Sequence, residues 1–188
     1  MVRVERWDGN PGRQAIVLPG ANYPASMPLL YYSRFTLRTR EWSITEVWWE
    51  QPAPAPQDWP GIVRAAAEHV LAGNNAEHVL LVGKSIGSLA LPLAAERGLP
   101  GIWLTPLLNR PPIRAALDTL RSPSLLVGGT DDSTWDGEAA RASGHEVLEL
   151  ADAHHGLEIT GDPVRSLDLL GQVVAAIDGF VARVESGD

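Results

Sequence analysis

The chain has 188 residues, of which 45% are hydrophobic and 20% are charged, and this size and composition are typical of one globular domain. Its formal net charge of −8 argues against nucleic acid or an anionic membrane as the main partner, because neutralising phosphates requires clustered Lys and Arg. The lack of cysteine excludes disulfides and a thiolate nucleophile. Residues 1–12 carry no signal-peptide pattern and no apolar run is long enough to span a bilayer, so we expect a soluble, cytoplasmic protein.

Short apolar runs alternate with helical patterns along the whole chain. Strands are predicted over residues 2–7, 15–18, 43–49, 79–82, 101–104, 124–127 and 146–150. Helices are predicted over residues 26–38, 59–73, 88–97, 114–120, 137–142 and 162–184. This rhythm predicts a three-layer α/β/α sandwich, in which a mostly parallel sheet of about six or seven strands is covered on both faces by helices of a single domain, residues 1–188.

Particular residues are predicted to start, bend or bury these helices. Ser26 and Asp58 are predicted N-caps, and Pro92 is expected to kink the helix that contains it. Residues 51–57 alternate proline with alanine and predict an extended surface linker. In the last helix, the 3-4 spacing of apolar side chains predicts one buried face, formed by Leu167, Leu170, Val174, Ile177, Val181 and Val184.

A serine lies between two glycines where a buried strand is predicted to pass into a helix. In Gly83-Lys84-Ser85-Ile86-Gly87 the glycines let the two elements approach closely, and the tight turn exposes the serine Oγ, as a nucleophile requires. The alternative for Ser85 is a small residue at a tight junction. The Gly-Lys-Ser end also resembles a phosphate-binding P-loop, but that motif needs a glycine where His78 stands, which disfavours nucleotide binding.

Two later loops offer an acid and a base. Ligands collect beyond the carboxyl ends of parallel strands, and there the chain places Asp131-Asp132 after one late strand and His154-His155 after the next. The order along the chain is therefore serine, aspartate, histidine. In the alternative interpretation, each histidine is a surface loop residue and the aspartate is a helix cap or a turn residue. Adjacent loop histidines lack the spacing of metal ligands, so neither a metal site nor a cofactor is predicted.

This arrangement resembles the α/β-hydrolase family, in which a serine on a strand-turn-helix elbow is followed by the acid and then the histidine. Residues 127–132 are similar to the family's strand that ends in Gly-Thr-x-Asp, and residues 152–157 are similar to its histidine loop. The resemblance selects Asp132 and His155. It implies that Ser85 is the nucleophile, His155 its base, and Asp132 the group that orients the imidazole.

The resemblance also implies the rest of a site. The backbone N–H groups of Ile86 and Ala21 would bind the oxyanion, and Asn22, Tyr23 and Trp135 would line a pocket unless the aromatic rings fill the core. The chain has no room for a lid domain, which implies an open site for small or flexible acyl groups.

Two positions depart from the family pattern, because Pro19 stands where histidine is more frequent and Lys84 is unusual beside the serine. The resemblance implies a serine hydrolase that acts on a small-molecule ester or thioester through an acyl-enzyme. The alternative is a hydrolase-fold binding protein that retains the triad residues but has a closed or misaligned pocket. The sequence does not indicate an oligomeric state.

Overall fold

Seven strands form one sheet in the part of the chain that the computed structural model describes, residues 2–50 and 55–187. The strands are β1 (Val2–Trp7), β2 (Asn10–Leu18), β3 (Trp42–Trp49), β4 (His78–Lys84), β5 (Gly101–Leu104), β6 (Ser124–Gly129) and β7 (Glu146–Leu150). Their order across the sheet is β1-β3-β2-β4-β5-β6-β7. Only β1 runs antiparallel to its neighbour, so the predicted, mostly parallel sheet is confirmed.

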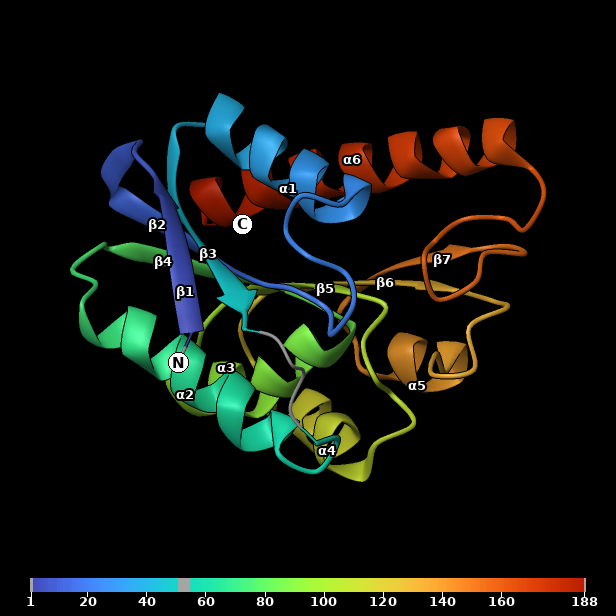
Figure 1. Cartoon of the computed structure of the whole chain (residues 1–188), viewed down its shortest axis with the longest axis horizontal. Coiled ribbons are helices and arrows are strands. Elements are labelled where there is room, and N and C mark those ends of the chain that lie inside the picture. The colour runs from blue at the N-terminus through green and yellow to red at the C-terminus, as the bar shows by residue number, and fades with distance from the viewer. Residues whose placement is uncertain (1, 51–54, 188) are drawn as a thin grey trace.

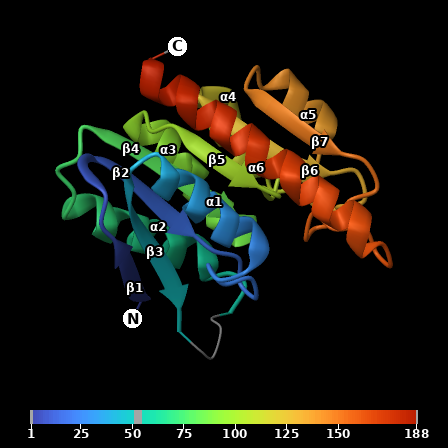
Figure 2. The same ribbon diagram turned by 90° about the horizontal axis from the view of Figure 1, so that it is seen from above.

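Helices cover both faces of this sheet. They are α1 (Pro28–Thr39), α2 (Trp59–Ala72), α3 (Leu91–Arg97), α4 (Pro111–Thr119), α5 (Gly137–Ala142) and α6 (Pro163–Ser186), with a 3₁₀ segment, η1 (Ser85–Ala90), between β4 and α3. Figure 1 shows α1 and α6 on one face and the other helices on the opposite face. In the perpendicular view of Figure 2, α1 and α6 lie side by side across the strands. The predicted three-layer sandwich is thus confirmed.

The central strands are buried on both faces because their side chains alternate between two hydrophobic cores. In β2, Ile16 and Leu18 belong to the core beneath α2, α3 and α4, whereas Ala15 and Val17 belong to the core beneath α1 and α6. All four side chains are fully buried. Burial of such apolar area on both faces supplies most of the free energy that holds the layers together.

Three expectations about helix ends need correction. The N-cap of α1 is Met27 and not Ser26. Asp58 is the N-cap of α2, as predicted, but its side chain makes no capping hydrogen bond. Pro92 does not kink a helix, because η1 ends before it and α3 begins at Leu91. The proline therefore lies in a first helical turn, where no backbone hydrogen bond is lost. The predicted linker at residues 51–57 falls largely outside the described residues.

The buried face of α6 differs in part from the predicted one: Ile177 and Val181 are buried as predicted, whereas Leu170, Val174 and Val184 are half-buried. Its buried side chains are Leu169, Val173, Ile177, Phe180 and Val181. The periodic pattern contained Leu167, which is 67% exposed, because the start of α6 is apolar on more than one side. Packing against α1 and the sheet selects the face at Leu169 and leaves Leu167 free to border the cavity described below.

The parallel strands bring four loops to one edge of the sheet. The loops follow β2, β4, β6 and β7, and the strands β4, β5, β6 and β7 are consecutive neighbours in the sheet. These are the loops that hold the predicted oxyanion, serine, acid and histidine residues. None of the helices in residues 2–50 and 55–187 is long and apolar enough to cross a membrane.

Candidate active site

The serine turn is a backbone conformation that side chains rarely adopt. Strand β4 ends at Lys84, and Ser85 follows with a φ of 54°, in the left-handed region. This region costs a residue with a Cβ about 1 to 2 kcal/mol, and such outliers persist where the surrounding structure enforces them. The chain then enters η1 directly, so that Ser85 lies at the junction of strand and helix.

The two flanking glycines are required by close backbone contacts. A Cβ on Gly87 would lie 2.0 Å from the carbonyl oxygen of Leu18 on β2, and a Cβ on Gly83 would lie 2.8 Å from the backbone of Gly87. Glycine is therefore the residue that allows η1 to pack directly on β2 and β4. The elbow that the sequence predicted has this steric basis.

Replacing Gly87 by alanine is expected to lower the free energy of unfolding by about 3 kcal/mol, because the backbone of Leu18 is not able to move aside as a flexible side chain would. Gly171→Ala is the matched control. Gly171 is exposed within α6 and has no atom near its Cβ position, so the same change is expected to add about 0.5 to 1 kcal/mol. Urea unfolding of both variants measures the difference, and equal effects would contradict the steric argument.

Three of the predicted side chains form one chain of hydrogen bonds. The Nε2 atom of His155 lies 2.8 Å from the Oγ atom of Ser85, and its Nδ1 atom lies 2.7 Å from Oδ2 of Asp132. An ionised carboxylate only accepts hydrogen bonds, so Nδ1 carries a proton and Nε2 accepts from the serine hydroxyl. Asp132 precedes His155 by 23 positions in the sequence and Ser85 precedes it by 70, so the structure joins residues from three separate loops.

The other member of each pair lies apart from this chain. Asp131 is exposed, and its amide donates to the carbonyl of Ala153. The Nδ1 atom of His154 accepts a hydrogen bond from the amide of Gly156, and its Nε2 lies 4.0 Å from a carboxylate oxygen of Glu158. The geometry therefore separates Asp132 and His155 from the neighbours that the sequence left as alternatives.

Asp132 is buried and held ionised by donors. Burial acts to raise its pKa, but the hydrogen bond to His155 and two bonds from Thr134 outweigh burial and leave the pKa below its ordinary value of 3.8. The amide and the hydroxyl of Thr134 each lie 2.9 Å from Oδ1, and the same hydroxyl lies 3.2 Å from Nδ1 of His155. Thr134 was not among the predicted site residues. A donor two residues after an aspartate is the signal of an Asx-type turn.

The acid and histidine loops contact each other through their backbones. The amide of Thr130 donates to the carbonyl of Leu150, and the amide of Asp152 donates to the hydroxyl of Thr130. A Cβ on Gly129 would lie 2.1 Å from the carbonyl oxygen of Ala153. The two loops are therefore packed without space for a side chain between them at this point.

Within residues 2–50 and 55–187, three backbone amides beside Ser85, those of Ala21, Asn22 and Ile86, take no part in the backbone hydrogen bonds that shape their loops. Gly20 and Tyr23 close a turn through their own amides and carbonyls, which leaves the amides of Ala21 and Asn22 within the turn. A Cβ on Gly20 would lie 3.6 Å from the Cβ of Ser85, so this turn is packed against the serine. Ile86 is the second residue of η1, where an N–H has no partner inside the helix.

Lys84 is almost completely buried beneath these loops. It is 2% exposed, and its Nζ atom donates a 2.8 Å hydrogen bond to the carbonyl of His155. The ammonium also stands 5.0 Å from the centre of the Tyr23 ring, which is within the range of a cation–π contact. Burial lowers the pKa of Lys84 from its ordinary value to about 8, and the Asp132 carboxylate acts in the opposite direction.

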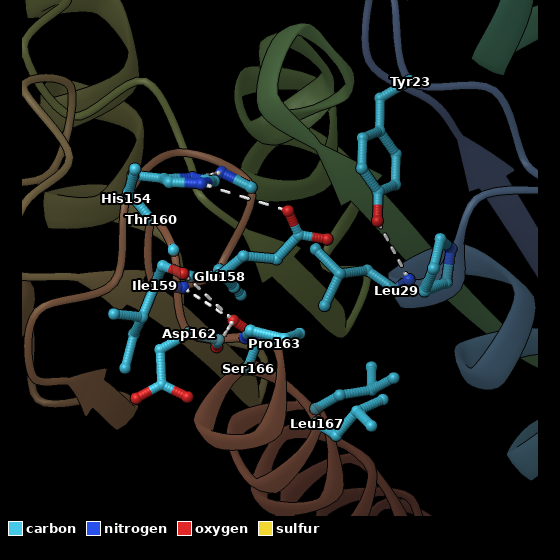
Figure 3. A pocket seen from close by; sticks show the side chains of 15 residues that line it. Tyr23, Leu29, His154, Glu158, Ile159, Thr160, Asp162, Pro163, Ser166 and Leu167 are labelled. Atoms are coloured by element: carbon cyan, nitrogen blue, oxygen red, sulfur yellow. Dashed lines mark hydrogen bonds and ion pairs between the residues drawn. The ribbon is translucent and has the colours of Figure 1, made fainter.

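A cavity of about 510 Å³ lies beside the histidine loop, between the first turns of α1 and α6. Its lining includes Tyr23, Leu29, His154, Leu157, Glu158 and Leu167. Figure 3 shows the Tyr23 ring on one side, the loop from His154 to Asp162 on the other, and the Glu158 side chain between them. The described residues that line it include the carboxylates of Glu158 and Asp162 and neither lysine nor arginine.

The three residues predicted to line a pocket have different positions. Tyr23 lines the cavity, and its hydroxyl accepts a hydrogen bond from the amide of Leu29. Asn22 is exposed in the turn next to Ala21. Trp135 does not line the cavity: its ring covers Gly128 of β6, and its Nε1 donates to Glu149 of β7. Trp135 packs against the core beneath α2, α3 and α4, as its core alternative predicted.

The chain is similar in structure to solved hydrolases. It matches Est1E from Butyrivibrio proteoclasticus, solved with ferulic acid bound, at a TM-score of 0.74 and 13% identity over 98% of this chain and 96% of that one. It matches an α/β serine hydrolase without a lid from Xanthomonas campestris at a TM-score of 0.71 and 18% identity, covering 97% of this chain and 88% of the other. An esterase from Pyrococcus furiosus gives a TM-score of 0.70 and 13% identity, with 97% and 88% covered.

Sequence comparison adds nothing to these likenesses, because no protein-family model and no curated protein matches the chain. Among residues 2–50 and 55–187, no group of three His, Asp or Glu side chains is placed to hold a metal ion.

Proposed function

We propose that this chain, which has the α/β-hydrolase fold, is a serine hydrolase that cleaves a carboxylic ester or thioester through an acyl-enzyme. The observation that carries the proposal is the continuous hydrogen-bond chain from Ser85 through His155 to Asp132. A serine hydroxyl is a weak nucleophile at its own pKa, and a base within hydrogen-bond distance is what activates it.

The proposed acylation step follows from these contacts. Ser85 Oγ attacks the substrate carbonyl carbon while Nε2 of His155 takes the hydroxyl proton. Asp132 holds the imidazole in the required tautomer and stabilises the imidazolium. When the tetrahedral intermediate collapses, Nε2 returns the proton to the leaving alkoxide or thiolate, and the acyl group stays on Oγ. In the second half of the reaction, water attacks the acyl carbon by the same proton transfers, and the acid is released.

The oxyanion is proposed to be bound by the amides of Ile86 and Ala21. Ile86 follows the nucleophile at the start of η1, and Ala21 lies in the turn that is packed against Ser85. One such donor contributes about 3 kcal/mol to transition-state stabilisation, since it is already oriented before charge develops. The hydroxyl of Ser88 supports this geometry, because it donates to the Ser85 carbonyl and accepts from the amide of Leu107.

The substrate is proposed to carry a small or flexible acyl group and an apolar portion that binds in the cavity beside the histidine loop. Apolar walls favour such a group, and the absence of lysine and arginine from the lining disfavours anionic groups such as phosphates. Esters of neutral alcohols are therefore preferred to thioesters with a phosphorylated carrier. A cytoplasmic location and a role without nucleic-acid or membrane partners complete the proposal, on the composition given above.

The alternative, a binding protein with a closed or misaligned pocket, would be favoured if His155 lay beyond reach of Ser85 or if Asp132 pointed away from His155. Distances of 2.8 Å and 2.7 Å along the hydrogen-bond chain lie within bonding range, which supports catalysis over binding alone.

A fluorophosphonate probe tests the proposal, since it phosphonylates only an activated serine. We expect one adduct, located at Ser85 by peptide mass spectrometry, and loss of short-chain ester hydrolysis in parallel with labelling. Denatured protein is the control, because it retains every serine and loses the triad geometry. Folded protein that takes no label and hydrolyses no ester across a series of acyl lengths would refute the assignment.

A further inference from the structure

Lys84 is the one lysine in the chain, and the mechanism proposed above leaves it without a task. All other cationic side chains are arginines, and these lie at or near the surface, whereas Lys84 is 2% exposed. Its place is immediately before Ser85, at the end of β4. Such a residue is covalently part of the elbow and cannot move independently of the serine backbone.

The side chain of Lys84 contacts the two loops on either side of the elbow. Its Nζ atom donates to the carbonyl of His155 at 2.8 Å, which fixes the main chain of the proposed base. Its Cδ atom lies 3.5 Å from the Cβ position of Gly20, and its ammonium faces the Tyr23 ring at 5.0 Å. One side chain thus contacts the serine, histidine and oxyanion loops together.

Stability does not explain a lysine at this position. Among the described residues no carboxylate forms an ion pair with Nζ, and burial lowers the pKa of Lys84 to about 8. Asp132 attracts the ammonium only at longer range, while Tyr23 presents its ring to it and His155 presents its backbone carbonyl. A methionine of similar length would fill the volume without a desolvated charge.

We propose that Lys84 is a positioning residue for the reaction at Ser85, which holds the backbone of His155 and the oxyanion turn in register with the nucleophile. Asp132 fixes the imidazole ring by one end only, and the ring must keep its place while Nε2 gains and loses a proton. The hydrogen bond from Nζ of Lys84 to the carbonyl of His155 restrains the backbone of this histidine as well. The inference rests on the proposed hydrolase function.

Lys84→Met is the first test. We expect kcat on a short-chain ester to fall about 10- to 100-fold, since misplacement by about 1 Å is enough for such a loss, with KM little changed. The rate of fluorophosphonate labelling is expected to fall by the same factor. The urea midpoint is expected to stay level or rise, which a merely structural lysine would not do. Wild-type kcat in Lys84→Met would overturn the proposal.

The absence of cysteine from the chain allows a rescue experiment at this one position. Lys84→Cys, alkylated in urea with 2-bromoethylamine and refolded, carries a thioether isostere of lysine. The same variant alkylated with 1-bromopropane carries a methyl group in place of the ammonium. We expect the aminoethyl protein to recover most of the wild-type kcat and the propyl protein to match Lys84→Met. Equal activities of the two alkylated proteins, at equal unfolding midpoints, would show that the ammonium has no such role.

A readout without catalysis separates this inference from the proposed function. The Nδ1 proton between His155 and Asp132 is expected to give a downfield proton resonance, and loss of the Lys84 contact is expected to shift or broaden it. If wild type hydrolyses no ester but Lys84→Met changes this resonance, the hydrolase assignment fails and the positioning contact stands. If the resonance is identical in both proteins, the positioning proposal fails whatever the activity.

Discussion

Ser85→Ala is expected to lower kcat by about a million-fold, which would leave only the contribution of the oxyanion donors and of substrate binding. The variant lacks the Oγ atom that lies 2.8 Å from Nε2 of His155, so no acyl-enzyme can form. Single-turnover kinetics on an activated ester, with mass spectrometry of the trapped acyl group, measures the loss. A residual activity above one hundredth of the wild-type value would show that another nucleophile acts.

Ser85→Gly is the matched comparison for this result. Both variants remove Oγ, but only glycine adopts the left-handed φ of 54° without a penalty. We therefore expect Ser85→Gly to be equally inactive and more stable than Ser85→Ala by about 1 to 2 kcal/mol. Equal stability of the two variants would mean that the elbow relaxes in solution, and the nucleophile would then lack its enforced geometry.

Asp132→Asn is expected to lower kcat by about 10⁴-fold with little change in KM. The amide has nearly the same size and keeps an oxygen for the Thr134 donors, but it does not hold the tautomer in which Nδ1 of His155 carries the proton. Asp131→Asn is the control one residue away. Its side chain is exposed, so we expect an activity within twofold of wild type, and the opposite ranking of the two variants would reassign the acid.

The effect of Asp132→Asn on stability is expected to depend on pH. The folded-state pKa of Asp132 lies below its ordinary value of 3.8, so the ionised carboxylate stabilises the fold at pH values above 3.8 and ceases to do so as pH falls through the folded pKa. The difference in free energy of unfolding between wild type and Asp132→Asn is therefore expected to be full at neutral pH and to vanish in acid. Urea titrations at several pH values measure it.

The layers and the sheet were predictable because hydrophobic alternation is a local signal. Buried runs in β4 and β6 and the residues of α5 and β7 were recognised with bounds close to those observed. The N-cap at Met27 and the boundary between η1 and α3 before Leu91 were not recognised from the sequence. Both depend on how a loop or a 3₁₀ turn approaches the helix. The face of α6 was misjudged at Leu167 for a similar reason, because the neighbouring layer decides which apolar stripe is buried.

The site was predictable in its chain order and not in its supporting contacts. The spacing of Ser85, Asp132 and His155 follows from the strand ends of a parallel sheet, which is a topological regularity. Thr134 binds Asp132 within one Asx-type turn, whereas Lys84 contacts the carbonyl of His155 in another loop, and no periodicity encodes that second contact. Trp135 is close to Asp132 in the sequence, but its ring covers Gly128 and does not line the cavity. Closeness in sequence therefore does not by itself place a side chain in the site.

The burial of the chain's single lysine has a practical consequence for handling the protein. No ε-amine is presented at the surface of the folded molecule, because Lys84 is 2% exposed and is the sole lysine. Amine-directed dyes, cross-linkers and immobilisation chemistries therefore find no lysine side chain on the surface of the folded chain. Acylation of Lys84 by such a reagent instead reports that the elbow and the histidine loop have separated, which makes the rate of that reaction a measure of local opening.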